Sequence, residues 1–106
     1  MSLTKFEMDG FHKFQEWNKK NNVDTTNDFN KMRDHILNAE SVELSVALYI
    51  FLSKTLGSQD EIKQDEYIPK MFSLISEANN KFPEFYGWVK QIYEKHKVGI
   101  LPLGHE

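Results

Sequence analysis

The stretch SVELSVALYIFLSKTLG, residues 41–57, decides the fold of this chain. The even-numbered positions from 42 to 52 are all apolar, as on the buried face of a half-buried strand. The odd-numbered positions 47–51 are apolar as well, however, which a half-buried strand does not require. The run is also about twice as long as an ordinary strand, and no hairpin turn flanks it. We therefore predict a helix that is apolar nearly all round, and a strand is the alternative interpretation.

Both ends of this stretch carry helix-end signals. Ser41 can cap the first turn, Glu43 suits the positive end of the helix dipole, and Lys54 suits the negative end. Gly57 is predicted to follow the last turn as the C′ residue. Such a helix reaches only about 22 Å, against about 30 Å for the hydrocarbon core of a membrane, so we predict a core helix and no membrane span.

The chain before this stretch predicts two amphipathic helices. Thr4 and Glu7 form a capping box for a first helix that runs to about Lys20. Thr25 or Thr26 is predicted to cap a second helix that ends near Asn38. The predicted inner faces consist of Leu3, Phe6, Gly10, Phe14 and Trp17 in the first helix, and of Phe29, Met32 and Ile36 in the second.

Gly10 lies within the inner stripe of the first helix. A glycine there lacks a side chain, so another helix can approach closely, although glycine costs about 1 kcal/mol of helix propensity. Met8 and Phe11 lie off the stripe or at its edge. We expect these two apolar side chains to be partly exposed.

Residues 58–67 are acidic and mostly polar, and we interpret them as a loop with one or two helical turns, begun by a capping box of Ser58 and Glu61. Pro69 is predicted to sit in the first turn of a fourth helix, where its missing N–H costs little. Asn79 or Asn80 is predicted to close that helix.

A fifth helix is predicted to open at Pro83 and to end at Gly99 as its C′ residue. The tail after it, residues 98–106, cannot continue a helix. It either packs back on the domain or serves as a docking peptide. The whole chain, residues 1–106, is thus predicted to be all-α: a single-domain bundle of four to five helices around a central buried helix at about 41–57.

Composition restricts the possible functions. The 106 residues include no cysteine, which removes disulfides and thiolate chemistry and fits a cytoplasmic location. The formal charge of −3 argues against nucleic-acid binding, which needs a basic face. A nucleic-acid alternative would use the local patch of Lys19, Lys20, Lys31 and Arg33.

Potential metal ligands lie on the first two helices. They are Asp9, His12, Glu16, Asp28 and His35. The Glu-x-x-His motif of di-iron bundles is missing, and charged residues mostly face solvent. We predict no metal or other cofactor, and a ligand- or metal-binding bundle with a site between the first two helices is the alternative function.

Catalytic motifs are missing from the chain. It contains no Gly-x-Ser-x-Gly elbow, no phosphate-binding glycine loop and no calcium loop. His96 lies on the apolar face of the last helix, where it is a core or helix-end residue or, alternatively, a pH-responsive one. We do not predict an enzyme.

Aromatic residues gather in KFPEFYGWVKQIY, residues 81–93. Trp88 is displaced from the apolar stripe of this segment, next to an outward-facing glycine. Tryptophan is frequent in binding hot spots, so Trp88, Phe11 and Met8 are our predicted partner contacts. Packing of Trp88 under the ILPLG tail is the alternative.

In size, acidity, helix count and extended tail, the chain resembles the small helical bacteriocin immunity proteins, and no residue is carried over from this likeness. We predict a small soluble helical protein that works by binding another protein, as an adaptor, inhibitor, immunity-like factor or subunit, or by self-association.

Overall fold

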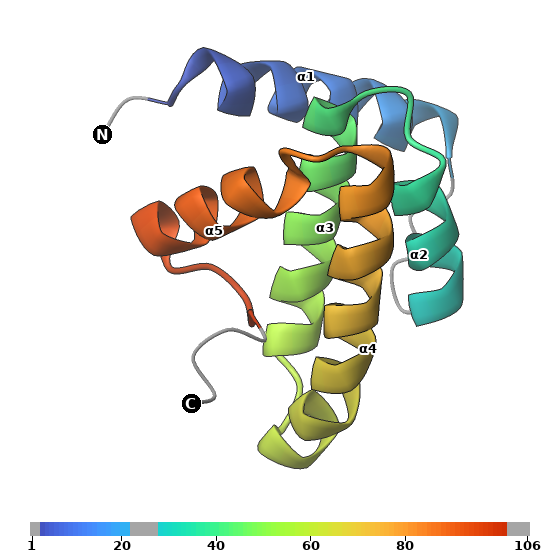
Figure 1. The fold of residues 1–106 in the computed structure, drawn as a ribbon, viewed down its shortest axis with the longest axis vertical. Helices are drawn as coiled ribbons and strands as arrows, with labels where there is room; N and C mark the ends of the chain where they lie inside the picture. The colour runs from blue at the N-terminus through green and yellow to red at the C-terminus, as the bar shows by residue number, and fades with distance from the viewer. Residues whose placement is uncertain (1–2, 22–27, 102–106) are drawn as a thin grey trace.

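In the computed structural model, which describes residues 3–21 and 28–101, the chain forms five helices and, within those residues, no strand. They are α1 (Lys5–Lys20), α2 (Phe29–Leu37), α3 (Val42–Gly57), α4 (Glu61–Lys81) and α5 (Phe85–His96). Helix α3 stands in the middle, α4 runs beside it, and α1 and α5 cross it (Figure 1). The predicted all-α bundle around a central helix is confirmed.

Helix α3 forms the centre of the core. Ser41 caps it by accepting a hydrogen bond from the backbone N–H of Leu44, and Glu43 and Lys54 lie in its first and last turns as predicted. Gly57 is the last helical residue instead of following the helix. The buried residues of α3 are Val42, Leu44, Ser45, Val46, Leu48, Tyr49, Leu52, Ser53 and Leu56.

Helix α1 begins with the predicted capping box of Thr4 and Glu7 and lies directly on α3. Gly10 is its buried contact point. A Cβ atom added at Gly10 would lie 2.9 Å from the backbone oxygen of Glu43 and 3.6 Å from the Cβ of Ala47. The missing side chain therefore allows the close approach that the sequence predicts.

Substituting Gly10 by alanine is expected to lower the free energy of unfolding by about 1 kcal/mol, measured by chemical denaturation. Crowding against a backbone atom costs about 1–3 kcal/mol, which outweighs the gain of about 1 kcal/mol in helix propensity. Gly87 of α5 is the matched control, because nothing lies within 4 Å of a Cβ added there. Gly87→Ala is expected to raise stability instead, and equal effects of the two substitutions would contradict the close approach.

Helix α2 begins later than predicted. Its cap is Asp28, whose carboxylate accepts a hydrogen bond from the backbone N–H of Lys31 at 3.2 Å. The predicted caps, Thr25 and Thr26, lie outside the described residues. The helix ends at Leu37, as predicted, and buries Met32 and Ile36 completely, so the predicted inner face is correct at these two positions.

Helix α4 corrects the prediction for residues 58–81. It begins at the cap Asp60, which accepts a hydrogen bond from the backbone N–H of Lys63, and it runs through Pro69 to Lys81. The hydroxyl of Ser58 does not cap it and instead donates to the carbonyl of Thr55. The helical turns predicted within residues 58–67 are present from Glu61 onward, but they continue through Pro69 into one long helix, whereas the sequence predicted a separate fourth helix with Pro69 in its first turn.

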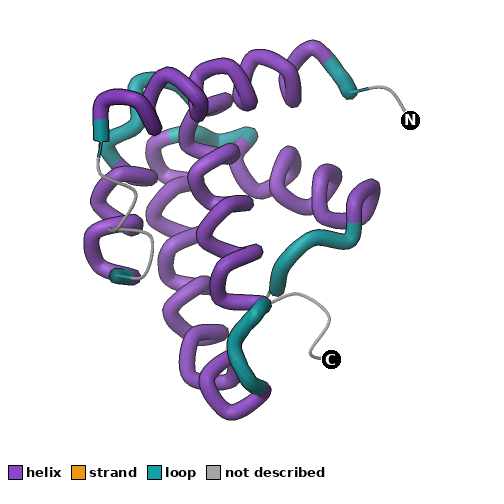
Figure 2. The backbone as a smooth tube through the Cα atoms, turned by 180° about the vertical axis from the view of Figure 1, so that it is seen from behind, coloured by secondary structure: helices purple, strands orange, loops and turns teal. Residues whose placement is uncertain are grey.

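Helix α5 begins at Phe85, shortly after Pro83, and ends at His96. The left-handed residue after it is Lys97, with φ 54°, whereas Gly99 lies two residues further on with φ 75°. Gly99 is thus not the C′ residue that the sequence predicts. The chain after α5 returns toward α3 (Figure 2), where Gly99 lies against Ser53.

The described part of the tail, residues 98–101, is not helical and packs back on α3. The backbone N–H of Ile100 donates to Ser53 Oγ at 2.8 Å, and the Ser53 hydroxyl donates to the carbonyl of Ile100. Leu101 is buried. The rest of the predicted tail, residues 102–106, lies outside the described residues.

None of the helices formed by residues 3–21 and 28–101 combines the length and the apolar character needed to cross a membrane, in agreement with the prediction of no membrane span.

Candidate functional site

A groove of about 460 Å³ opens between α1, α3 and α5, and we call it the α1/α3/α5 groove. Side chains of α3 form its floor, and α1 and α5 form its walls. Its size falls in the range of about 300–1,000 Å³ that is typical of ligand-binding pockets. Most of the lining is apolar, with the main contributions from Phe6, Phe11, Phe14, Ile50, Phe51 and Ile92.

Aromatic contacts hold the phenylalanines of the groove in place. The ring of Phe6 stacks on Trp88, with ring centroids 3.9 Å apart and the two planes parallel within 1°. Phe14 packs between Phe51 at 5.0 Å and Trp17 at 5.9 Å. These contacts hold Phe6 and Phe14 in position on the α1 side of the groove.

An ion-pair cluster closes the α1–α5 side of the groove. The carboxylate of Glu7 is 8 % exposed, and it lies 2.9 Å from Lys95 Nζ and 2.7 Å from His96 Nε2. Burial raises the pKa of Glu7, but hydrogen bonds from His96, Lys95 and Thr4 outweigh it and lower the pKa to about 2. Glu7 therefore stays ionised and ties α1 to α5.

A second ion pair links α1 to the start of α3. Lys13 Nζ lies 2.8 Å from Glu43 Oε2 and 3.2 Å from Ser41 Oγ. The hydrogen bond between Lys13 and Glu43 lowers the pKa of Glu43 and raises that of Lys13. Both carboxylates of the groove are thus paired.

Lys54 differs from these groups. It lines the groove from the last turn of α3, is exposed, and has no ion-pair or hydrogen-bond partner for its ammonium group among the described residues. Within the part of the chain that the structure describes, the groove is therefore mostly apolar, with Lys54 as its unpaired positive charge.

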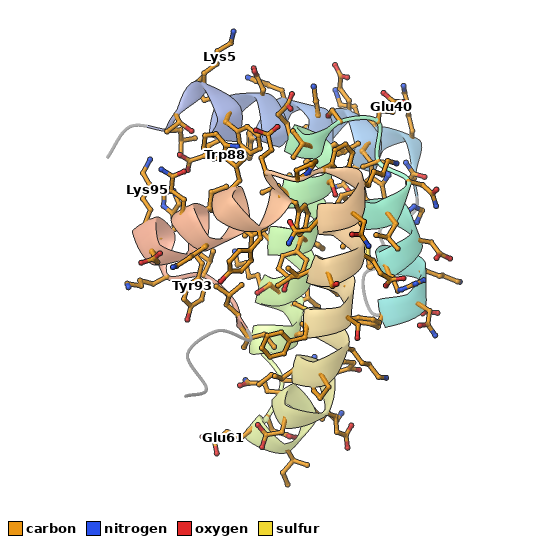
Figure 3. All side chains as sticks on the ribbon, in the orientation of Figure 1. Lys5, Glu40, Glu61, Trp88, Tyr93 and Lys95 are labelled. Carbon is orange, nitrogen blue, oxygen red and sulfur yellow. The ribbon has the colours of Figure 1, made fainter. Side chains whose placement is uncertain are left out.

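The predicted partner contacts fall into two groups. Phe11 is 56 % exposed and lines the groove, and Met8 is 47 % exposed one helical turn away. Trp88 is half-buried and points from α5 toward α1 (Figure 3), where it stacks on Phe6. The sequence predicts that Trp88 contacts a partner or packs under the tail. Neither prediction includes the stacking on Phe6.

The five potential metal ligands do not assemble into a site. Among the described residues, which include all five, no group of three or more His, Asp or Glu residues could hold a metal ion. The carboxylate of Asp28 caps α2, and the ring of His35 packs edge-on against Trp17 at 5.0 Å. His12 and Glu16 are exposed on α1.

The only arginine of the chain, a member of the predicted basic patch, is engaged elsewhere. The guanidinium of Arg33 donates two hydrogen bonds to the carboxylate of Glu77 on α4, one of them at 3.0 Å. This pair fixes α2 on α4.

Two features of the site were missed by sequence reasoning. Glu7 has a local role in the capping box, and nothing in the chain signals its pairing with His96, which lies 89 positions away. Lys54 could be recognised only as a helix-end cation, and its position in a groove depends on the placement of α1 and α5.

We compared the chain with protein-family models, with curated proteins and with solved structures, and none of the three comparisons found a match. The function is therefore argued from the geometry of the site.

Proposed function

We propose that the protein acts by binding another protein, and that the α1/α3/α5 groove with Phe11 at its edge is the binding site. The observation that carries the proposal is the exposed fraction of Phe11, 56 %, beside a groove lined by apolar side chains. Contiguous apolar surface of this kind on a monomer often marks an interaction site. Leu3, which precedes α1 and lines the groove, is 45 % exposed, and Met8 on α1 is 47 % exposed.

A partner segment with apolar side chains on one face would suit this site, because an amphipathic helix typically inserts such side chains into a hydrophobic groove. Large aromatic anchors contribute most of the binding free energy in such interfaces. Phe11 is the residue best placed for this role. We place the interaction in the cytoplasm, because the chain contains no cysteine.

Phe11→Ser is expected to weaken the partner complex at least tenfold, because hot-spot aromatics contribute more than about 1.4 kcal/mol each. The measurement is quantitative affinity capture from a lysate of the native host, comparing the tagged wild-type protein with the variant. A captured protein that depends on Phe11 would then be purified and its dissociation constant measured.

The matched control is Phe72→Ser. Phe72 is 49 % exposed, close to the value for Phe11, but it lies on α4 and does not line the groove. We expect its substitution to leave capture unchanged. A partner that binds the Phe11 variant as tightly as the wild type would contradict the proposed site. Trp88→Ala is a poorer test, because it removes the stacking on Phe6 and so disturbs the fold itself.

A further inference from the structure

The charges around the α1/α3/α5 groove are not balanced. Its two carboxylates, Glu7 and Glu43, are each held by a cation at 2.9 Å or less. Lys54 has no such partner among residues 3–21 and 28–101. Of the described residues, a ligand that entered the groove would therefore meet mainly apolar side chains and the unpaired charge of Lys54.

We propose that the α1/α3/α5 groove binds a small amphipathic carboxylate, with its alkyl chain against the phenylalanine-lined walls and its carboxylate at Lys54. An apolar groove of about 460 Å³ with a few polar groups, here Lys54 beside the paired Glu7, Glu43 and His96, is the usual composition of a small-molecule site. This inference goes beyond the proposed protein partner, and because it concerns the same groove, the carboxylate and the partner segment would compete for it.

A carboxylate is favoured over other head groups by the residues present. Phosphate recognition typically uses arginine in a bidentate arrangement, and the only arginine, Arg33, is bound to Glu77 away from the groove. A cationic amphiphile would be repelled by Lys54, since the nearby carboxylates are already paired. One lysine matches one carboxylate in charge.

Decanoate is the probe, titrated into the purified protein at concentrations where it is monomeric. Both tryptophans report on the groove, because Trp88 stacks on Phe6 and Trp17 packs on Phe14, two residues of its lining. We expect saturable binding with one site, seen as a change in tryptophan fluorescence. Octanoate should bind about 15-fold more weakly, since each buried methylene contributes about fourfold in affinity.

Lys54→Met tests the carboxylate contact, because methionine keeps an apolar stem and removes the charge. Decanoate should bind the variant about threefold more weakly, the size expected for a partly exposed ion pair. Decanol, which has no charge, should bind both proteins equally. Lys90→Met is the matched control, since Lys90 is an exposed lysine of α5 outside the groove.

Ile50→Glu tests the position of the alkyl chain. Ile50 is half-buried and lines the groove, so a carboxylate there should abolish decanoate binding in a protein whose helicity is unchanged by circular dichroism. Absence of saturable decanoate binding to the wild type would overturn the inference. So would unchanged binding in either variant. Neither result would affect the capture experiment with Phe11→Ser, so the two proposals can fail separately.

Discussion

Glu7→Gln is expected to lower the free energy of unfolding by about 2 kcal/mol at neutral pH. The glutamine side chain can still accept the capping-box hydrogen bond of Thr4, because glutamine serves in that motif as well as glutamate. It cannot, however, form the ion pair with Lys95, and it lacks the charge that strengthens the hydrogen bond with His96 Nε2; these two contacts hold α5 against α1. The substitution therefore isolates the link between the two helices from the local stability of α1.

The pH dependence of stability gives a second measure of the same link. Folding lowers the pKa of Glu7 from 4.5 to about 2, so the folded state binds a proton less readily than the unfolded state. The stability that this group contributes is complete above about pH 4.5 and is lost as the pH falls toward 2. Across this window, the wild type should lose more stability than Glu7→Gln.

Glu16→Gln is the control for removing one negative charge from α1. Glu16 is exposed on the same helix and forms no ion pair with the described residues. Its substitution should change stability by less than about 0.5 kcal/mol, as is usual for surface positions. Parallel stability curves for wild type and Glu7→Gln between pH 4.5 and 2 would contradict the ionised, buried state of Glu7.

The parts of the fold that sequence predicted well are those specified by local signals. Ser41 caps α3, and Thr4 with Glu7 caps α1, and in both cases the bonding groups lie within three residues of each other. The central position of α3 followed from its composition, because a helix that is apolar on nearly every side must be covered by others. Gly10 was identified from its place in an apolar stripe.

The errors occur where two local signals compete. Pro69 can begin a helix or be tolerated inside one, and the structure places it inside α4, which begins at Glu61. Similarly, Gly99 looks like a C′ residue, but Lys97 takes the left-handed conformation. The left-handed residue after α5 thus comes two positions earlier than predicted.

The candidate site was predicted only in part. The exposure of Phe11 and Met8 follows from their distance from the inner stripe of α1, so the helical period was sufficient to find them. The groove itself combines three helices whose relative placement is set by tertiary packing. For the same reason, the contact of Trp88 with Phe6, 82 positions apart, could not be read from spacing along the chain.

Gly99→Ala is expected to cost about 3 kcal/mol of stability, the largest loss that we predict for a single methyl group. Gly99 has φ 75°, a conformation that costs other residues about 1–2 kcal/mol. A Cβ atom there would also lie 2.6 Å from the carbonyl carbon of Ser53 and 2.7 Å from the backbone nitrogen of Lys54. Because these are backbone atoms of α3, they cannot turn aside, and the tail must move away.

The loss can be assigned to the tail by hydrogen exchange. The N–H of Ile100 is bonded to Ser53 in the wild type, so its protection should fall sharply in Gly99→Ala while the amides of α3 stay protected. Lys97→Gly is the opposite control: it relieves the left-handed strain at φ 54° without crowding and should raise stability by about 1 kcal/mol. If Gly99→Ala unfolds at the same denaturant concentration as the wild type, the tail does not pack on α3 in solution. In that case Val98 does not contribute to the lining of the groove.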